Sequence, residues 1–181
     1  MATALFLTTT ALQAQTFTGI DLGTPALSGS VTSNPDGTKT IVGGGADIWG
    51  TADAGYYYYA TISDPVWDAV VHVRDLQGPD TWTKCELMVR VPDGATPDAA
   101  DPFIAAMTTR TGGQNQVAPQ WRTARGGNAD WNAFGRTIRP TYPGTWLRIQ
   151  RQWSIFTMWY GNDGVNWTKY VDIDTAKTDV V

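Results

Sequence analysis

Acid–base chemistry has few candidate residues in this chain. Glu86 is the only glutamate and His72 the only histidine among the 181 residues. A retaining glycosidase needs two carboxyl groups about 5–5.5 Å apart, but the residues that would share a strand face with Glu86 are Met88 and Arg90. The aspartates cluster in turn sequences, where they usually bond to their own backbone. The sequence therefore disfavours a glycoside hydrolase.

His72 offers one further catalytic hypothesis. In a polysaccharide lyase, a histidine beside Arg74 or Arg90 and a tyrosine could act as a base. The alternative is a histidine on the face of a sheet that hydrogen-bonds to a neighbouring residue. The sequence has no Ser-His-Asp arrangement, phosphate-binding loop or dinucleotide fingerprint. We therefore expect a domain without catalytic activity.

Aromatic side chains indicate a different chemistry, the binding of sugars by stacking. The nine tryptophans and seven tyrosines exceed what a core of this size needs. Several tryptophans lie in or beside loops rich in hydrogen-bonding residues, which favours exposure, whereas Trp49 is expected in the core. The predicted carbohydrate-binding surface consists of Trp82, Glu86, Arg90, Trp121, Arg122 and Trp131. The alternative is that these tryptophans fix loops to the body of the domain.

A calcium site is the remaining chemical hypothesis. Calcium takes six to eight oxygen ligands, often from loop aspartates and carbonyls. Asp47 and Asp53 lie six residues apart in a glycine-rich segment and are the candidate ligands. Hydrogen bonds that stabilise turns explain both aspartates about equally well, so the two alternatives stay open. No other cofactor is expected.

Strands separated by turn signals must position these residues. The alternation of Lys84–Val91 predicts one buried and one more exposed face. The buried face holds Cys85, Leu87, Val89 and Val91, and the exposed face holds Lys84, Glu86 and Arg90. Cys85, the only cysteine, is expected to be a buried, unreactive thiol.

The other strands complete an all-β pattern. They are predicted over Thr38–Val42, Tyr56–Ile62, Ala69–Leu76, Phe103–Arg110, Val117–Arg125, Trp146–Arg151, Ser154–Tyr160 and Trp167–Ile173. Because no segment has a convincing helical period, the chain is expected to fold as a two-sheet antiparallel β-sandwich.

Four sequence blocks, in order, resemble a known family. They are FTGIDLGTPALSGS, GGGADIWGTADAGYYYY, AVVHVRDLQGPDTWTKCELMVR and YGNDGVNWTKY. They resemble the concanavalin A-like, laminin G-like domain of secreted bacterial proteins that is often labelled "regulation of enolase protein". Its motifs match Asp21–Gly23, Gly45–Asp53, Trp82–Arg90 and Asp163–Trp167, and the resemblance extends from Phe17 to Tyr170.

The resemblance implies a jelly-roll that serves as an accessory module of secreted or cell-surface proteins. Members of the family usually carry one or two more strands after the last motif. We therefore expect that the C-terminal strands of the jelly-roll are missing here or are supplied by another chain. An open sheet edge of this kind is a site for self-association.

The chain termini and the charge set the cellular context. Residues 1–15 are expected to be a signal peptide or its remnant, with a disordered or strand-forming leader as the alternative, and residues 16–181 form the domain. The net charge of −4 argues against nucleic acid and anionic membranes as partners. The predicted location is therefore secreted or cell-surface, and the predicted partner is a polysaccharide or cell-surface glycan.

Three functions follow from these features. The leading one is a non-catalytic binding or adhesion module for carbohydrate. The first alternative is a structural subunit of an extracellular filament or surface layer, whose sheet edges and aromatic patches contact neighbouring copies. The second alternative is a polysaccharide lyase or glycoside hydrolase.

Overall fold

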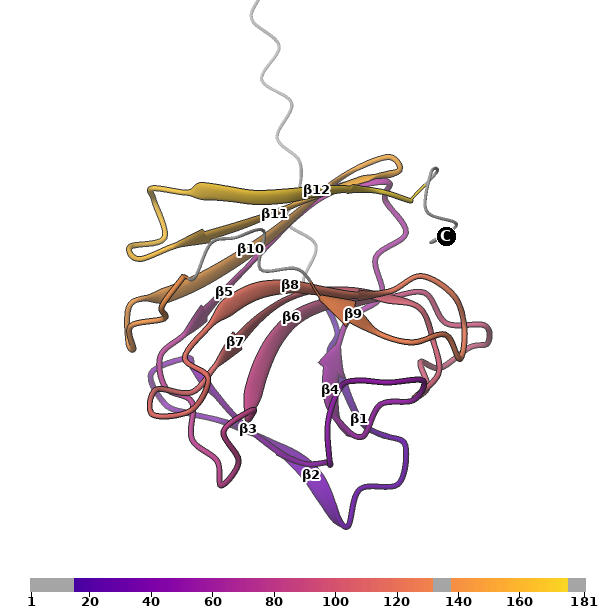
Figure 1. Ribbon diagram of the computed structural model, residues 1–181, viewed down its shortest axis with the longest axis horizontal. Helices are drawn as coiled ribbons and strands as arrows, with labels where there is room; N and C mark the ends of the chain where they lie inside the picture. The colour runs from indigo at the N-terminus through magenta and orange to yellow at the C-terminus, as the bar shows by residue number, and fades with distance from the viewer. Residues whose placement is uncertain (1–14, 132–137, 176–181) are drawn as a thin grey trace, which may run out of the picture.

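The computed structural model describes residues 15–131 and 138–175, which form two antiparallel four-stranded sheets packed as a sandwich (Figure 1). Sheet A contains, in spatial order, β12 (Thr168–Asp174), β11 (Ile155–Gly161), β10 (Thr145–Gln152) and β5 (Val66–Val73). Sheet B contains β6 (Lys84–Arg90), β7 (Phe103–Thr109), β8 (Val117–Arg122) and β9 (Asp130–Trp131). The described chain is thus all-β, as predicted.

The main hydrophobic core lies between the two sheets. Leu147 and Ile149 of β10 and Met158 of β11 meet Ile104 and Ala106 of β7, and all five side chains are buried. On β6, the residues that pack against this core are Cys85, Leu87 and Val89. The predicted core face of that strand is therefore confirmed, except that Val91 lies beyond the end of the strand and is half-buried.

A third layer covers the opposite face of sheet B. It consists of the segment 45–54 and the ribbon β1 (Thr18–Leu22) with β4 (Gly55–Tyr59), and a second ribbon, β2 (Leu27–Ser33) with β3 (Lys39–Gly44), packs on β1 and β4 (Figure 1). Ile48 of this segment packs against Phe103 and Ala105 of β7. As a result, every residue of β7 is buried, on both of its faces.

This third layer makes the predicted exposure of the second face of β6 wrong. Arg90 is buried, and both carboxyl oxygens of Glu86 are inaccessible to solvent. Lys84 keeps only 9% of its side chain exposed. The alternation of the strand was read correctly, but its polar face is covered by another part of the same chain.

Asp53, in segment 45–54, forms a buried ion-pair network with two arginines of sheet B. Arg90 Nη2 donates to Asp53 Oδ2 at 2.7 Å, and Arg122 donates to both carboxylate oxygens at 2.8 and 2.6 Å. None of the three side chains is exposed. Both guanidinium groups also lie over the ring of Phe103, at 5.4 and 5.0 Å. This network fixes segment 45–54 to the ends of β6 and β8.

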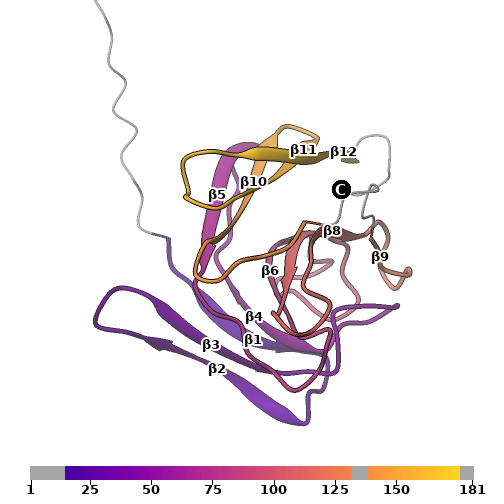
Figure 2. The same cartoon turned by 60° about the vertical axis from the view of Figure 1, so that its left-hand side comes forward.

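The ribbon β2–β3 projects from the third layer on the side away from sheet A (Figure 2). Its contact with β4 depends on glycines that face Tyr56. A Cβ atom added at Gly29 would lie 2.2 Å from Tyr56 Cδ2, and one added at Gly43 would lie 3.4 Å from Tyr56 Cβ. Beyond this contact the ribbon is mostly exposed.

We expect that Asp53→Asn lowers the free energy of unfolding by about 3–5 kcal/mol, because two buried arginines would lose their only carboxylate partner in this network. Urea denaturation measures this difference. The matched control is Asp36→Asn, which alters the exposed Arg74–Asp36 pair (2.8 Å) and should leave the midpoint nearly unchanged. Equal effects of the two substitutions would contradict the structural role assigned to Asp53.

Candidate binding site

A cleft of about 280 Å³ opens on the covered face of sheet B, where segment 45–54 leaves part of that face accessible. Three of its lining residues are tryptophans, and the others are polar or flexible. The lining residues are Asp47, Trp49, Trp82, Lys84, Met107, Gln120 and Trp131.

The strand register explains why these residues meet. Gln120 pairs with Trp131 and with Ala105, and Met107 pairs with Glu86. Because directly opposed residues and every second residue of a strand share a face, the register places Lys84, Met107, Gln120 and Trp131 on one face of sheet B. Asp47 and Trp49 reach the cleft from segment 45–54, and Trp82 from the chain just before β6.

The tryptophans form a partly open aromatic corner. The rings of Trp82 and Trp131 meet edge to face, with centroids 6.2 Å apart and planes inclined by 76°. Trp82 is 38% exposed and Trp49 is 40% exposed, so both keep ring surface available to a ligand. The expectation that Trp49 belongs to the core is therefore wrong.

The floor of the cleft is a polar network centred on Lys84. Lys84 Nζ forms an ion pair with Asp47 Oδ1 at 2.8 Å and donates to the Ile48 carbonyl at 3.2 Å and to Gln120 Oε1 at 3.5 Å. Gln120 Nε2 donates to the same Ile48 carbonyl at 2.6 Å. The ammonium group of Lys84 is thus surrounded by three protein oxygens and its charge is paired with a carboxylate. The ammonium also lies 6.0 Å from the centroid of the Trp49 ring.

Glu86 lies on the same face of β6 as Lys84 but does not line the cleft. Within the described residues, neither of its buried carboxyl oxygens has a hydrogen-bond partner. Burial raises the pKa of Glu86 from 4.5 to about 8, the charge of Lys84 opposes this rise, and the carboxylates of Asp53 and Asp47 add to it. Glu86 is therefore mostly protonated at neutral pH, which avoids a buried unpaired charge.

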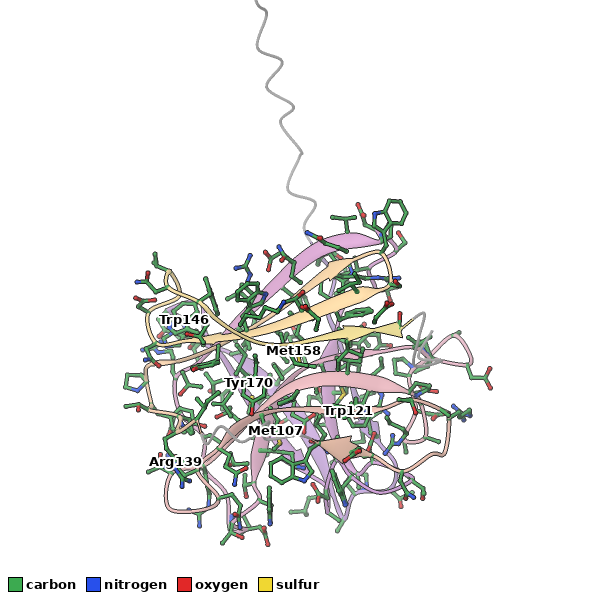
Figure 3. The ribbon with its side chains drawn as sticks, turned by 45° about the horizontal axis from the view of Figure 1, so that its top comes forward. Met107, Trp121, Arg139, Trp146, Met158 and Tyr170 are labelled. Carbon is green, nitrogen blue, oxygen red and sulfur yellow. The ribbon has the colours of Figure 1, made fainter. Side chains whose placement is uncertain are left out.

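The structure brings together only part of the predicted surface. Trp82 and Trp131 line the cleft, and Glu86 lies beside it under the third layer. Trp121 points to the other face of β8 and packs against the core between the sheets, to which Met158 of sheet A also belongs (Figure 3). Its predicted exposure as a solvent-facing ring is a misassignment, because the alternation of β8 puts Trp121 on the core side.

The two predicted arginines and the two predicted calcium ligands have other partners. Arg90 and Arg122 are buried on Asp53 and have no side-chain surface with which to contact a ligand. Both oxygens of Asp53 accept from these arginines, so Asp53 is not available to a cation. Asp47 accepts from Lys84 and from the backbone of Ile48. Among the residues that the structure describes, no cluster of His, Cys, Asp or Glu could hold a metal ion.

His72 is a hydrogen-bonded histidine on the face of a sheet, which is one of the two roles that the sequence left open. Cys85 is an unreactive thiol, as the sequence predicts. The His72 ring stacks on Trp146 with centroids 4.1 Å apart, and its Nε2 hydrogen-bonds to the Pro143 carbonyl on the far face of sheet A. Burial raises the pKa of the Cys85 thiol to about 11, so it is protonated and unreactive at neutral pH. Neither residue reaches the cleft.

Sequence reasoning missed Lys84 and Gln120 as members of the site. A signal was present, since both alternate with core residues of their strands and so share one face. The contribution of Trp49 had no local signal, because its position depends on contacts with distant strands.

Comparison with family models, with curated proteins and with solved structures finds no match to this chain. The concanavalin A-like resemblance therefore stays a prediction. Over residues 15–131 and 138–175, no helix is long and apolar enough to cross a membrane.

The raised pKa of Glu86 predicts a pH-dependent stability. Between pH 4.5 and about 8 the folded protein keeps a proton that the unfolded chain releases. The free energy of unfolding should therefore fall as the pH rises through this window, by a few kcal/mol, and level off above it. Glu86→Gln removes the titrating group while keeping the shape of the side chain. The free energy of unfolding of this variant should therefore lack the pH dependence that Glu86 contributes.

Urea denaturation of both proteins across this pH range measures the effect. The stability of Glu86→Gln relative to the wild type should increase toward pH 8 and stay constant below pH 4.5. Parallel pH profiles of the two proteins would show that Glu86 ionises normally in the fold.

Proposed function

We propose that this chain is a non-catalytic carbohydrate-binding module that binds glycan in the cleft between Trp49, Trp82 and Trp131. The observation that carries the proposal is the combination of exposed tryptophan surface with a polar floor in one cleft. Sugars present apolar CH faces and hydroxyl edges, so they match a site with both features. Consistent with this role, we propose a secreted or cell-surface location and a polysaccharide or cell-surface glycan as the partner.

The resemblance to concanavalin A-like domains is compatible with the sandwich. We propose a jelly-roll topology of that type, because sheets A and B are antiparallel throughout and β5, which precedes sheet B in the sequence, pairs with β10, which follows it. The β5–β10 pairing joins strands that are far apart in the sequence, whereas the β6–β7 pairing joins consecutive strands. The proposal rests on the order of the motifs together with this mixture of connections.

The environment of Glu86 favours binding over hydrolysis. A raised pKa is what a general acid requires, but the acid must also come within hydrogen-bond reach of the substrate. The carboxyl oxygens of Glu86 are buried, and Glu86 does not line the cleft. Asp47, the carboxylate that does, is paired with Lys84. This arrangement supports a site that holds a sugar without cleaving it.

Retention on insoluble polysaccharides tests the proposal. We expect Trp82→Ala and Trp131→Ala to weaken retention about ten- to a hundredfold, because each removes a stacking surface. The melting temperature of Trp82→Ala should change little, because Trp82 is partly exposed, and that of Trp131→Ala should fall modestly. A panel of cellulose, chitin, mannan, galactan and pectin provides neutral, amino-sugar and acidic surfaces.

Two further tryptophans provide the controls. Trp153, 70% exposed at the turn between β10 and β11, lies on sheet A, and Trp153→Ala should leave retention unchanged. Trp121→Ala should lower the melting temperature, because Trp121 packs in the core. Equal loss of retention in Trp153→Ala and Trp82→Ala, or no retention of the wild type on any polymer, would overturn the proposal.

A second candidate function, a structural subunit that contacts its own copies, is favoured by the ribbon β2–β3. Leu27 is 73% exposed, and Ile41 and Val42 are about half exposed. Because consecutive residues of a strand point to opposite faces, Ile41 and Val42 leave exposed apolar side chains on both faces of the ribbon. Neither strand has a second neighbour among the described strands. Such a ribbon can pair with another chain.

Light scattering at increasing protein concentration tests this second candidate. If the ribbon mediates self-association, the mass of the wild type should rise with concentration, and Val42→Lys should keep the protein monomeric. Val165→Lys makes the same substitution at a valine that is 77% exposed in the turn between β11 and β12, away from the ribbon, and is the control. A wild type that stays monomeric at all concentrations would exclude this function.

A further inference from the structure

We infer that the cleft recognises the end of a glycan chain, and that the terminal sugar unit it accepts carries no negative charge. This inference rests on the proposed carbohydrate-binding function and goes further, because it states which part of a glycan and which chemical class of sugar the site takes. Its two parts depend on the arrangement of the tryptophan rings and on the charges of the floor.

The arrangement of the rings favours a chain end. A site for the middle of a polysaccharide presents rings side by side, so that successive sugar units stack along one surface. Here the planes of Trp82 and Trp131 are inclined by 76°. A sugar stacked on one of these rings has the other ring across its path. The corner therefore closes around a unit that has only one neighbour.

The size of the cleft agrees with this reading. Its volume of about 280 Å³ lies just below the range of small-molecule sites, which is about 300–1,000 Å³. This space suits one or two sugar rings. Affinity gained from further units would have to come from residues outside the cleft.

Among the described lining residues, no unpaired cation is available to bind an acidic ligand. Lys84 is the only basic residue among the described lining residues. Its ammonium group is already paired with the Asp47 carboxylate and hydrogen-bonded to Ile48 and Gln120, and only 9% of its side chain is exposed. A carboxylate or sulfate on a sugar would thus have to displace Asp47 from Lys84, which would leave a carboxylate without its partner.

The charged side chain that remains accessible at the cleft, Asp47, is an acceptor. Lys84 and the Ile48 amide both bond to Asp47 Oδ1, and Oδ2 has no partner among the residues that the structure describes. The Asp47 side chain is 42% exposed, so Oδ2 can accept from a sugar hydroxyl or an ammonium group. The faces of the tryptophan rings are also electronegative. All of these groups favour a neutral or basic sugar and disfavour an acidic one.

Titration calorimetry with matched oligosaccharides tests both parts. The probes are glucose, galactose and mannose oligosaccharides of increasing length, each with its amino-sugar and uronic-acid counterpart. For at least one of the three series, we expect binding of the neutral form, and an affinity that stops rising after about two units, as the cleft volume implies. The uronic-acid form of that series should bind at least about tenfold more weakly, as expected for a desolvated like charge.

Asp47→Asn separates the charge argument from general damage to the site. It removes the negative charge while keeping an acceptor oxygen, so the gap between neutral and uronic-acid forms should narrow to less than about threefold. Trp82→Ala is the comparison variant, since it should weaken every form alike.

The outcomes distinguish this inference from the function on which it rests. Affinity that keeps rising with each added unit, or uronic-acid forms that bind as tightly as neutral ones, would overturn the inference and leave carbohydrate binding intact. Absence of binding in every series would overturn the proposed function, and the inference with it.

Discussion

The carboxylate of Asp53 lies where separate parts of the chain meet, and its pairing with Arg90 and Arg122 constrains the rest of the structure. Arg122 also donates to the carbonyls of Gly50, Ala99 and Asp101. Charges removed from water must be matched by partners at the right distance, so this network allows one placement of the third layer on sheet B. Without it, the polar face of sheet B would have to be solvated.

The same network determines the shape of the cleft. The backbone of segment 45–54 is held from below by side chains of β8, since Gln120 donates to the Ile48 carbonyl and Arg122 to the carbonyls of Trp49 and Gly50. The partly exposed ring of Trp49 is therefore mounted on a backbone whose polar groups are fixed. A rigid support of this kind reduces the entropy that a ligand must remove on binding.

Local patterns predicted which side chains share a strand face, but not what covers that face. The alternation of β6 correctly placed Cys85 and Leu87 in the core, and the same argument would have placed Trp121 there. It failed for Arg90 and Glu86, because a polar face opposite a core is normally solvated, and the covering segment lies more than thirty residues away. The aromatic content indicated a binding surface, whereas the position of Trp49 depends on long-range contacts that no local pattern contains.

The covered face of sheet B is more polar than stability alone would require. Apolar residues of similar volume at buried ionic positions are often as stable or more so, yet this face carries Lys84, Glu86 and Gln120 side by side. Lys84 and Gln120 are satisfied through Asp47 and Ile48, and Glu86 keeps its proton. Violations of simple packing rules concentrate at functional sites, and here they surround the cleft that is lined by partly exposed tryptophans. The polar floor and the aromatic walls therefore belong to one site, whose charge pattern is set by residues that contribute little to the core.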